Sequence, residues 1–299
     1  MNRILIVVIL AILFISCAED KGTDPFVEID SSFSSINIGT DSTFDIITWN
    51  IENFPKQNGS TVDYLAELIP LLDVDIIALQ EIRSATDFQN LINSLDNYDG
   101  ILTNSASYDI NLALLYSKDL AIELIYEIFV DDWWSFPRSP LVAHFIWNGQ
   151  EIYIINNHFK ANDDGSEDEA RRNSASENLE DYINEYLSGE NVIVLGDLND
   201  ELNEDPSNNV FQNFIIDSTN YKFVDMNIAY GSKGNWSYPS WPSHLDHILI
   251  TNELFDEFDN EGSSVQTIRL EEYFDNGWTK YENYISDHRP VGLRLKFSQ

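Results

Sequence analysis

The sequence contains a single cysteine, Cys17, and only 16 basic residues against 51 acidic ones among its 299 residues. One cysteine cannot form a disulfide within the chain, so the stability of the fold must come from a hydrophobic core. The hydrophobic fraction of 43% is sufficient for such a core. The formal net charge of −35 predicts repulsion of polyanions at long range. This charge fits either a surface suited to a salty or calcium-rich medium or a protein that does not act on nucleic acid.

Long apolar runs are absent except between Ile4 and Ile15. These twelve residues would span about 18 Å as a helix, less than the hydrocarbon core of a bilayer. Behind the basic start Asn2-Arg3 they predict a signal peptide, residues 1–17. Cys17 follows a small residue, as in the signals of bacterial lipoproteins. We therefore expect an exported protein with a lipid on Cys17, anchored in a bacterial cell envelope or at the cell surface. Phe14, where such signals usually have Leu, leaves simple secretion as the alternative.

The remaining chain divides into a tether and one large domain. Residues 18–43 are rich in Ser, Asp, Glu, Gly and Thr without a sustained period, which predicts a flexible acidic tether. Residues 44–299 contain no internal repeat and fit a single domain, which we expect to be monomeric.

Strand and helix patterns are mixed along this domain. The alternating run 44–49 predicts a strand, and apolar residues at helical spacing predict helices within 62–72, 88–95 and 168–187. Further strands are predicted at 74–79, 111–116, 141–147, 151–156, 191–195, 247–250 and 291–297. Asn148-Gly149 is a hairpin signal. The mixture favours two sheets with helices outside over a regular parallel βαβ series.

Polar residues of catalytic type are concentrated at the ends of the predicted strands. They lie in the segments 48–53, 78–83, 156–159, 196–199, 245–247 and 286–290. The first four segments follow an apolar strand, and the last two precede one. If the last two strands run antiparallel to the others, all six segments meet at one rim of the sheets, where they form a site without burying charge in the core.

These six segments, in this order, resemble the endonuclease/exonuclease/phosphatase superfamily, which includes deoxyribonuclease I, exonuclease III-like repair enzymes and neutral sphingomyelinases. One segment alone would be a weak match, but six in order across residues 44–299 are highly specific. The resemblance implies an α+β fold, a four-layer α/β/β/α sandwich of two packed, mostly antiparallel sheets flanked by helices. It also implies a metal-dependent phosphoric ester hydrolase.

The resemblance implies a metal site. Glu81 resembles the principal ligand, and Asn50 is expected near the same ion. Asp287 is expected either to bind metal or to assist another group. Carboxylate and amide oxygens suit a hard cation such as Mg²⁺ or Mn²⁺, and the number of ions, one or two, stays open.

The resemblance also implies the acid–base groups. His288 resembles the general base or phosphate-contacting histidine, since a neutral imidazole is available near neutral pH, and Asp246 resembles the acid that orients it. Asp197 and Asn199 resemble the pair that positions the attacking water and the scissile phosphate. His158 lies where deoxyribonuclease-like members have a second histidine, for phosphate contact or for protonation of the leaving oxygen. A histidine of the core is the alternative.

Several cationic and aromatic residues are candidates for substrate binding. Arg138 resembles a family arginine near the scissile phosphate, and Arg83 and Tyr108 are further candidates for phosphate contact. A local surplus of cations around the site is expected from Arg83, Arg138, Lys160, Arg171, Arg172 and Arg289. Alternatively, Arg171 and Arg172 pair with acids 167–169 in a solvated helix start. The aromatic segments 133–136 and 235–242 either stack on bases, insert among lipid head groups or pack beneath loops.

The predicted function is an extracytoplasmic nuclease that hydrolyses DNA or RNA by in-line attack of water on phosphorus. A metal ion at Glu81 would neutralise developing charge, while His288 with Asp246 handles the proton. The alternative is a phospholipid or inositol-phosphate phosphodiesterase or phosphatase of the sphingomyelinase type, whose small substrate tolerates an acidic surface. A third hypothesis is an inactive surface binding protein that keeps the fold.

Overall fold

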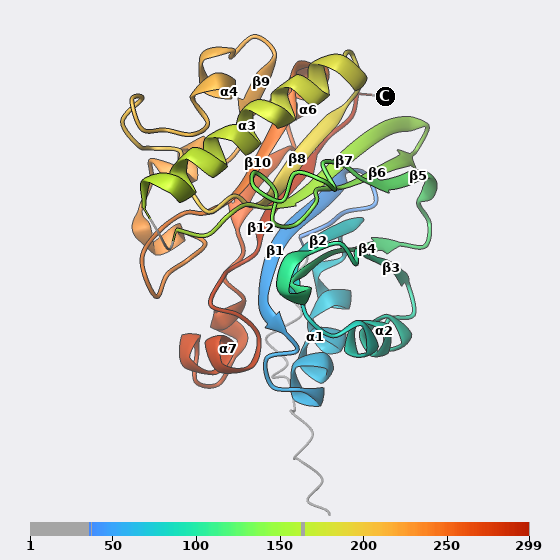
Figure 1. The fold of residues 1–299 in the computed structure, drawn as a ribbon. Coiled ribbons are helices and arrows are strands. Elements are labelled where there is room, and N and C mark those ends of the chain that lie inside the picture. The colour runs from blue at the N-terminus through green and yellow to red at the C-terminus, as the bar shows by residue number, and fades with distance from the viewer. Residues whose placement is uncertain (1–35, 37, 163–164, 299) are drawn as a thin grey trace, which may run out of the picture.

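The computed structural model describes residue 36 and residues 38–162 and 165–298. In this part of the chain two six-stranded sheets pack face to face, with helices on their outer faces (Figure 1). The predicted four-layer sandwich is therefore confirmed. The signal peptide, Cys17 and most of the tether lie outside the described residues. Among the described residues, none of the helices has the length and apolar character that crossing a membrane requires.

The first sheet has the order β11-β12-β1-β2-β4-β3. Its strands are β1 (Phe44–Phe54), β2 (Ile76–Ile82), β3 (Tyr98–Leu102), β4 (Asn111–Ser117), β11 (Ser264–Thr267) and β12 (Val291–Leu295). The helices α1 (Gly59–Leu72), α2 (Ala85–Asn93) and α7 (Trp278–Tyr284) lie on its outer side (Figure 1). Only β1 and β2 pair in parallel, so the sheet is mostly antiparallel, as expected.

The second sheet has the order β5-β6-β7-β8-β10-β9. Its strands are β5 (Ala121–Glu127), β6 (Leu141–Trp147), β7 (Gln150–His158), β8 (Val192–Asp197), β9 (Tyr221–Phe223) and β10 (Asp246–Thr251). The long helix α3 (Ser166–Tyr186) and the short α4 (Gln212–Ile216) cover its outer face, while α5 (Met226–Ala229) and α6 (Phe255–Asp259) follow β9 and β10. Here only β7 and β8 are parallel.

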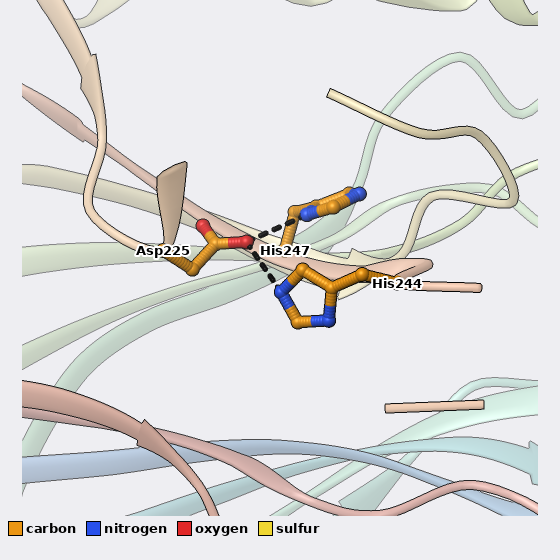
Figure 2. Close-up of side chains that lie close together, drawn as sticks. All are labelled: Asp225, His244 and His247. Carbon is orange, nitrogen blue, oxygen red and sulfur yellow. Dashed lines mark hydrogen bonds and ion pairs between the residues drawn. The ribbon is translucent and has the colours of Figure 1, made fainter. Parts of the chain in front are cut away.

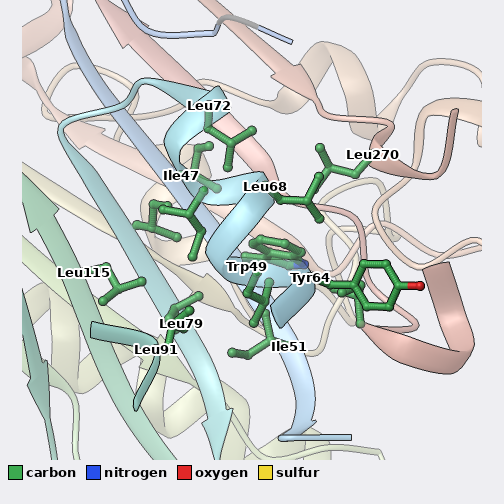
Figure 3. Packing of buried hydrophobic residues seen from close by; sticks show 14 of the residues in the cluster. Ile47, Trp49, Ile51, Tyr64, Leu68, Leu72, Leu79, Leu91, Leu115 and Leu270 are labelled. Carbon is green, nitrogen blue, oxygen red and sulfur yellow. The ribbon is translucent and has the colours of Figure 1, made fainter. Parts of the chain in front are cut away.

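Alternation along β1 builds two layers of the core at once. Ile47, Trp49 and Ile51 face α1 and α2 (Figure 3), whereas Phe44 and Ile46 face the second sheet. All five side chains are fully buried. Since burial of such a side chain contributes about 1.5–3 kcal/mol, these two layers, with a third between the second sheet and α3, can stabilise a domain that has no disulfide.

The predicted hairpin joins β6 and β7. Asn148 and Gly149 have φ values of 47° and 84°, as a two-residue turn that follows the twist of the strands requires. Asn tolerates this left-handed region better than most residues, and Gly adopts it without strain.

The predicted tether, residues 18–43, extends too far toward the C-terminus, because its last residues belong to the domain. Ile36 and Ile38 are buried in the core beneath α1, and the backbone nitrogens of Ile38 and Gly39 donate to the carbonyl oxygen of Leu72 at 3.2 and 3.0 Å. The domain therefore includes residues before Phe44. Two apolar side chains in a polar stretch carry no periodicity, so the sequence pattern did not reveal this contact.

Candidate active site

Four strands carry a polar residue at the same rim of the sandwich: β7 and β8 end with it, β10 begins with it, and β1 continues past it to Phe54. In each strand every second side chain faces the other sheet, and the polar residue continues that series. The series are Phe44, Ile46, Thr48 and Asn50 in β1; Ile152, Ile154, Asn156 and His158 in β7; Ile193, Leu195 and Asp197 in β8; and, in the opposite direction, Ile250, Ile248 and Asp246 in β10. The antiparallel pairing of β10 with β8 brings Asp246 opposite Asp197, so the expected meeting of strand ends occurs.

Glu81 reaches this rim because β2 is irregular. Leu79 faces the helices, and strict alternation would turn Glu81 to the same side. Instead Glu81 has a φ of 67°, and the pairing of β2 with β4 shifts register between Leu79 and Ile82. This bulge turns the carboxylate toward Asn50, whose Nδ2 donates to Oε1 at 3.2 Å. The second oxygen of Glu81 accepts from the backbone nitrogen of Asn53 at 2.8 Å.

A buried polar layer below the rim joins the two sheets. Gln80 donates from Nε2 to Oδ1 of Asn156 at 2.8 Å, and Asn156 donates to the carbonyl oxygens of Leu79 and Ala113 at 3.0 and 2.9 Å. Both side chains are fully buried. Neither residue was predicted to have a role, although a polar side chain at an inward-facing strand position is a detectable signal.

Asp197 lies at the centre of the site. Its Oδ2 accepts from Nδ2 of Asn50 at 2.9 Å and lies 3.6 Å from Nε2 of His158 and 3.9 Å from Nε2 of His288. Nε2 of His158 also lies 4.0 Å from Oε1 of Glu81. Burial raises the pKa of Asp197 to about 7, and the nearby acids Asp246 and Glu81 add to this effect.

His288 is held by Asp246 from the other sheet. Nδ1 of His288 lies 2.7 Å from Oδ2 of Asp246. The ring of Tyr238 packs on the imidazole, with the ring centroids 4.8 Å apart. Burial lowers the pKa of His288, but Asp246 and Asp197 outweigh this and raise it to about 10. The predicted neutral imidazole is not favoured here, because these carboxylates raise the pKa of His288 above neutral pH.

The second histidine, His158, differs from His288 in its charge. Burial lowers the pKa of His158 well below its usual value, and the cations Arg138 and His288 lower it further. His158 is therefore neutral at neutral pH. The two histidines thus differ in charge at neutral pH although both lie near Asp197.

The oxygen ligands that a hard cation needs are present. Glu81, Asp197 and Asp287 line the same cleft, and Oδ1 of Asp287 lies 4.0 Å from Nε2 of His288. A cation would fit here, because Asp197 is buried, Glu81 and Asp287 are only partly exposed, and carboxylates that share one cleft favour a compensating positive charge. Asn50 presents its amide nitrogen to Glu81 and Asp197, while its oxygen accepts from the backbone nitrogen of Glu52 at 3.0 Å. In this arrangement Asn50 holds the carboxylates in place, and its role as an oxygen ligand stays a prediction.

The predicted phosphate-binding residues do not all reach the cleft. Arg138 lines it and donates to the carbonyl oxygen of Phe159 at 3.3 Å, as Asn199 does at 3.1 Å. Tyr108 is 88% exposed and does not line the cleft. Arg83 lies outside it as well, on the surface, and donates to Asn53.

The cleft of about 710 Å³ is acidic rather than cationic. Among the described residues it is lined by two arginines, Arg138 and Arg172, by the imidazole of His288, and by eight acidic residues: Glu52, Glu81, Glu169, Asp197, Asp200, Glu201, Glu204 and Asp287. The expected surplus of cations is therefore wrong. The expected solvated helix start is wrong for Arg172 too, because this side chain is buried and its Nε donates to Asp200 at 2.8 Å. Arg171 instead donates to backbone carbonyls of Trp134 and Trp133.

The aromatic segments have mixed positions. Trp236 is buried and Tyr238 covers His288, as expected for rings that pack beneath loops. Trp241 lines the cleft with 78% of its surface exposed, at the tip of a small hairpin closed by hydrogen bonds of 3.0 Å in both directions between Tyr238 and Ser243. Trp133 is 70% exposed but does not line the cleft.

Oxygen ligands for a hard cation beside buried acid–base groups are what hydrolysis of a phosphate ester requires, and with this fold they define a metal-dependent phosphoric ester hydrolase. The model of the endonuclease/exonuclease/phosphatase family matches residues 47–288, and the chain belongs to this family. The predicted family and enzyme class are thus confirmed.

Solved structures with the same fold have low sequence identity. A structure of D. rerio TDP2 complexed with single-strand DNA product has 16% identity and a TM-score of 0.66, covering 86% of this chain and 100% of that one. The human Nocturnin catalytic domain with bound sulfate has 17% identity and a TM-score of 0.60, covering 86% and 95%. A mannosyl-6-phosphatase of Bacteroides thetaiotaomicron has 16% identity and a TM-score of 0.59, covering 85% and 100%. No curated protein sequence matches the chain.

Proposed function

We propose that the chain is a metal-dependent phosphodiesterase that acts outside the cytoplasm on nucleic acid, and that it prefers short or single-stranded substrates. The observation that carries the chemistry is the position of Asp197, 3.6 Å from His158 and 3.9 Å from His288 at the rim that also holds Glu81. Carboxylates for a cation, a proton acceptor and a phosphate-binding imidazolium lie within one cleft.

The charge states suggest how the residues share the work. Asp197, which lies at the centre of the site between His158 and His288, is suited to accept the proton of the attacking water. His288 is an imidazolium that can donate to a phosphoryl oxygen, and Asp246 orients it. Mg²⁺ or Mn²⁺ held at Glu81 and Asp287 would supply charge neutralisation on the phosphoryl oxygens. Water attacks phosphorus directly as the bond from phosphorus to the leaving oxygen breaks, and the leaving oxygen takes its proton from solvent water, so the enzyme forms no covalent intermediate.

Two features support a short or single-stranded nucleic acid. Eight carboxylates around the cleft repel a duplex, which brings many phosphates at once. Trp241 offers an exposed ring on which a base can stack, and D. rerio TDP2, which has the same fold, was solved with single-strand DNA product.

A substrate panel tests this proposal. Single-stranded DNA, RNA oligonucleotides and duplex plasmid would be incubated with Mg²⁺ or Mn²⁺, with and without chelator. We expect chelator-sensitive cutting of single strands and slow cutting of duplex. Glu81→Gln, tested in parallel, separates hydrolysis by this chain from contamination. Absence of any metal-dependent cutting of nucleic acid would refute the proposed substrate.

The acidic cleft favours one other candidate, a phosphodiesterase or phosphatase of small phosphate esters such as lipid head groups, inositol phosphates or sugar phosphates. A substrate with a single phosphate meets less repulsion from eight carboxylates. The sugar phosphatase among the proteins of the same fold is compatible with this candidate. Release of phosphocholine or inorganic phosphate without cutting of oligonucleotides would identify it.

We also propose export through residues 1–17 and anchoring through a lipid on Cys17. The proposal rests on the apolar run that ends at this cysteine. Metabolic labelling with a radioactive fatty acid should label the wild-type protein but not Cys17→Ser.

A further inference from the structure

A second acid–histidine cluster lies on the opposite face of β10 from Asp246. His247 is the next residue after Asp246, so its side chain points away from the active site. Oδ2 of Asp225 lies 2.6 Å from Nδ1 of His247 and 3.0 Å from Nε2 of His244 (Figure 2). All three side chains are buried, and the other oxygen of Asp225 accepts from the backbone nitrogen of Ile248 at 3.0 Å.

The hydrogen bonds of His244 argue against a metal site in this cluster. Its Nδ1 accepts from the backbone nitrogen of Ser237 at 3.3 Å, so the proton of a neutral ring is on Nε2, which faces Asp225. A metal ion bound to Nε2 would require the proton of the neutral ring to be on Nδ1. That proton would then face the backbone N–H of Ser237, and two donors cannot form a hydrogen bond with each other. His247 has an acceptor on each side, Asp225 and, at 2.9 Å, the carbonyl oxygen of Asp200, so both of its nitrogens carry protons. Its positive charge balances Asp225.

Ser237 connects this cluster to the catalytic pair. It is fully buried, and its hydroxyl oxygen accepts from the backbone nitrogens of Leu245 and Asp246 at 3.1 and 3.2 Å. Its carbonyl oxygen accepts from the backbone nitrogen of Arg289, the residue after His288, at 2.7 Å. One residue therefore holds the backbone beside both members of the Asp246–His288 pair, and His244 holds that residue in turn.

We propose that Asp225 is a positioning residue, which acts through His244 and Ser237 to hold Asp246 at hydrogen-bond distance from His288. The same carboxylate binds the backbone nitrogen of Ile248 and the ring of His247, so it also fixes the course of β10 directly after Asp246. Asp246 and His288 come from different sheets, and a small displacement of either backbone lengthens their contact. The expected effect of Asp225 on turnover rests on the proposed function. Its expected effect on the hydrogen bond between Asp246 and His288 does not.

The first test measures the pair without reference to activity. In the wild-type protein, the proton on Nδ1 of His288 should give a strongly downfield NMR resonance. We expect Asp225→Asn to shift this resonance upfield or broaden it. Asp259→Asn, which removes the same charge from a surface site in α6, should leave it unchanged. An unchanged resonance in folded Asp225→Asn would overturn the proposal, whatever the substrate proves to be.

The second test separates positioning from general destabilisation. We expect Asp225→Asn to lower kcat by about 10–100-fold, with a smaller change in KM. In an Asp246→Asn background the same substitution should lower kcat by less than about twofold, because the contact it supports is already lost. Equal losses in both backgrounds would show a merely structural role and overturn the proposal.

Two further measurements cover the remaining outcomes. If Asp225→Asn does not fold, Ser237→Ala, which removes only the hydroxyl, should give the same resonance shift and the same dependence on Asp246, and no shift there would overturn the proposal. Zinc retained by the wild-type protein and lost on His244→Gln would show a metal site instead. If the wild-type protein hydrolyses no phosphodiester but Asp225→Asn still shifts the His288 resonance, the proposed function is refuted and the positioning role of Asp225 stands.

Discussion

His288 and Asp246 face each other from the two sheets, with Nδ1 of the histidine 2.7 Å from Oδ2 of the aspartate. His288 lies in the segment before β12 of the first sheet, and Asp246 is the first residue of β10 in the second. The contact therefore forms only when the two sheets are packed in this relative position. The buried bond between Gln80 and Asn156 lies one layer below and holds that register from inside.

Loss of either member of this pair should lower activity without unfolding the domain. We expect His288→Ala to lower kcat/KM by at least about 10³-fold, because it removes a charged donor to the phosphoryl group. Asp246→Asn should cost about 10–100-fold, since it disturbs the orientation and charge of His288 and leaves the ring in place. Steady-state kinetics would be measured beside thermal melting. Undiminished metal-dependent hydrolysis in His288→Ala would contradict the assigned role.

Metal removal should abolish turnover. Chelation is expected to stop hydrolysis, and Mg²⁺ or Mn²⁺ should restore it, because the carboxylates of Glu81 and Asp287 are hard oxygen ligands. Glu81→Gln keeps the size of the side chain and removes its charge, so calorimetry should show weaker binding of the cation. Full activity in the presence of chelator would show that no exchangeable cation takes part.

Gly196 should be intolerant of any side chain. Its φ is 147°, and a Cβ there would lie 2.0 Å from the carbonyl oxygen of Asn157 in the neighbouring strand. We expect Gly196→Ala to lower the free energy of unfolding by about 3 kcal/mol or more. Gly189→Ala is the control: φ is 83° there, but no atom lies within 4 Å of the added Cβ, so the cost should be about 1 kcal/mol. Equal losses of unfolding free energy in the two variants, measured by urea denaturation, would show that the close approach to Asn157 does not contribute.

Asp75 should make the fold less stable as pH rises. Burial raises its pKa from 3.8 to about 7, and its Oδ2 accepts from the backbone nitrogen of Asp45 at 2.8 Å. The folded state therefore binds the proton more tightly than the unfolded state, and stability present at low pH is lost between the two pKa values. We expect Asp75→Asn, which keeps an acceptor and cannot ionise, to stabilise the fold by about 2 kcal/mol near pH 8 and by little near pH 4. Thermal melting at both pH values measures this, with surface Asp259→Asn as the charge control; the same shift at both would contradict it.

Trp241 should affect binding more than turnover. We expect Trp241→Ala to raise KM for a single-stranded oligonucleotide by about tenfold with little change in kcat, because stacking of one base contributes about 1–3 kcal/mol. An oligonucleotide that lacks the base next to the scissile phosphate should be insensitive to the change. Trp133→Ala, another exposed tryptophan outside the cleft, is the matched control. An equal effect of both substitutions would argue against a stacking site at Trp241.

Elements with a strong pattern could be predicted, and weak ones could not. The strand 141–147 agrees with β6 residue for residue, because seven residues between turn signals have one periodicity. The strands β3, β5, β9 and β11 were missed, and these four are the edge strands of the two sheets. Edge strands bury less side-chain surface, as the mostly exposed residues of β5 illustrate, so their alternation is weak.

Which cationic side chains reach the site could not be predicted from their positions in the sequence. Arg83 and Arg172 both lie near catalytic segments, yet Arg83 is at the surface and Arg172 is buried against Asp200. A long side chain reaches several ångströms from its backbone, so proximity in the chain does not decide which cavity it lines.

The sequence by itself determined which strands carry polar residues of the site, the order of those residues, and through alternation the face on which Asn50, Asp197 and Asp246 lie. Only the tertiary structure decided the charge states of His158, Asp197 and His288, the turning of Glu81 into the site, and the acidity of the cleft. The reason is that these properties depend on burial and on distances between groups from different strands, which no local pattern encodes.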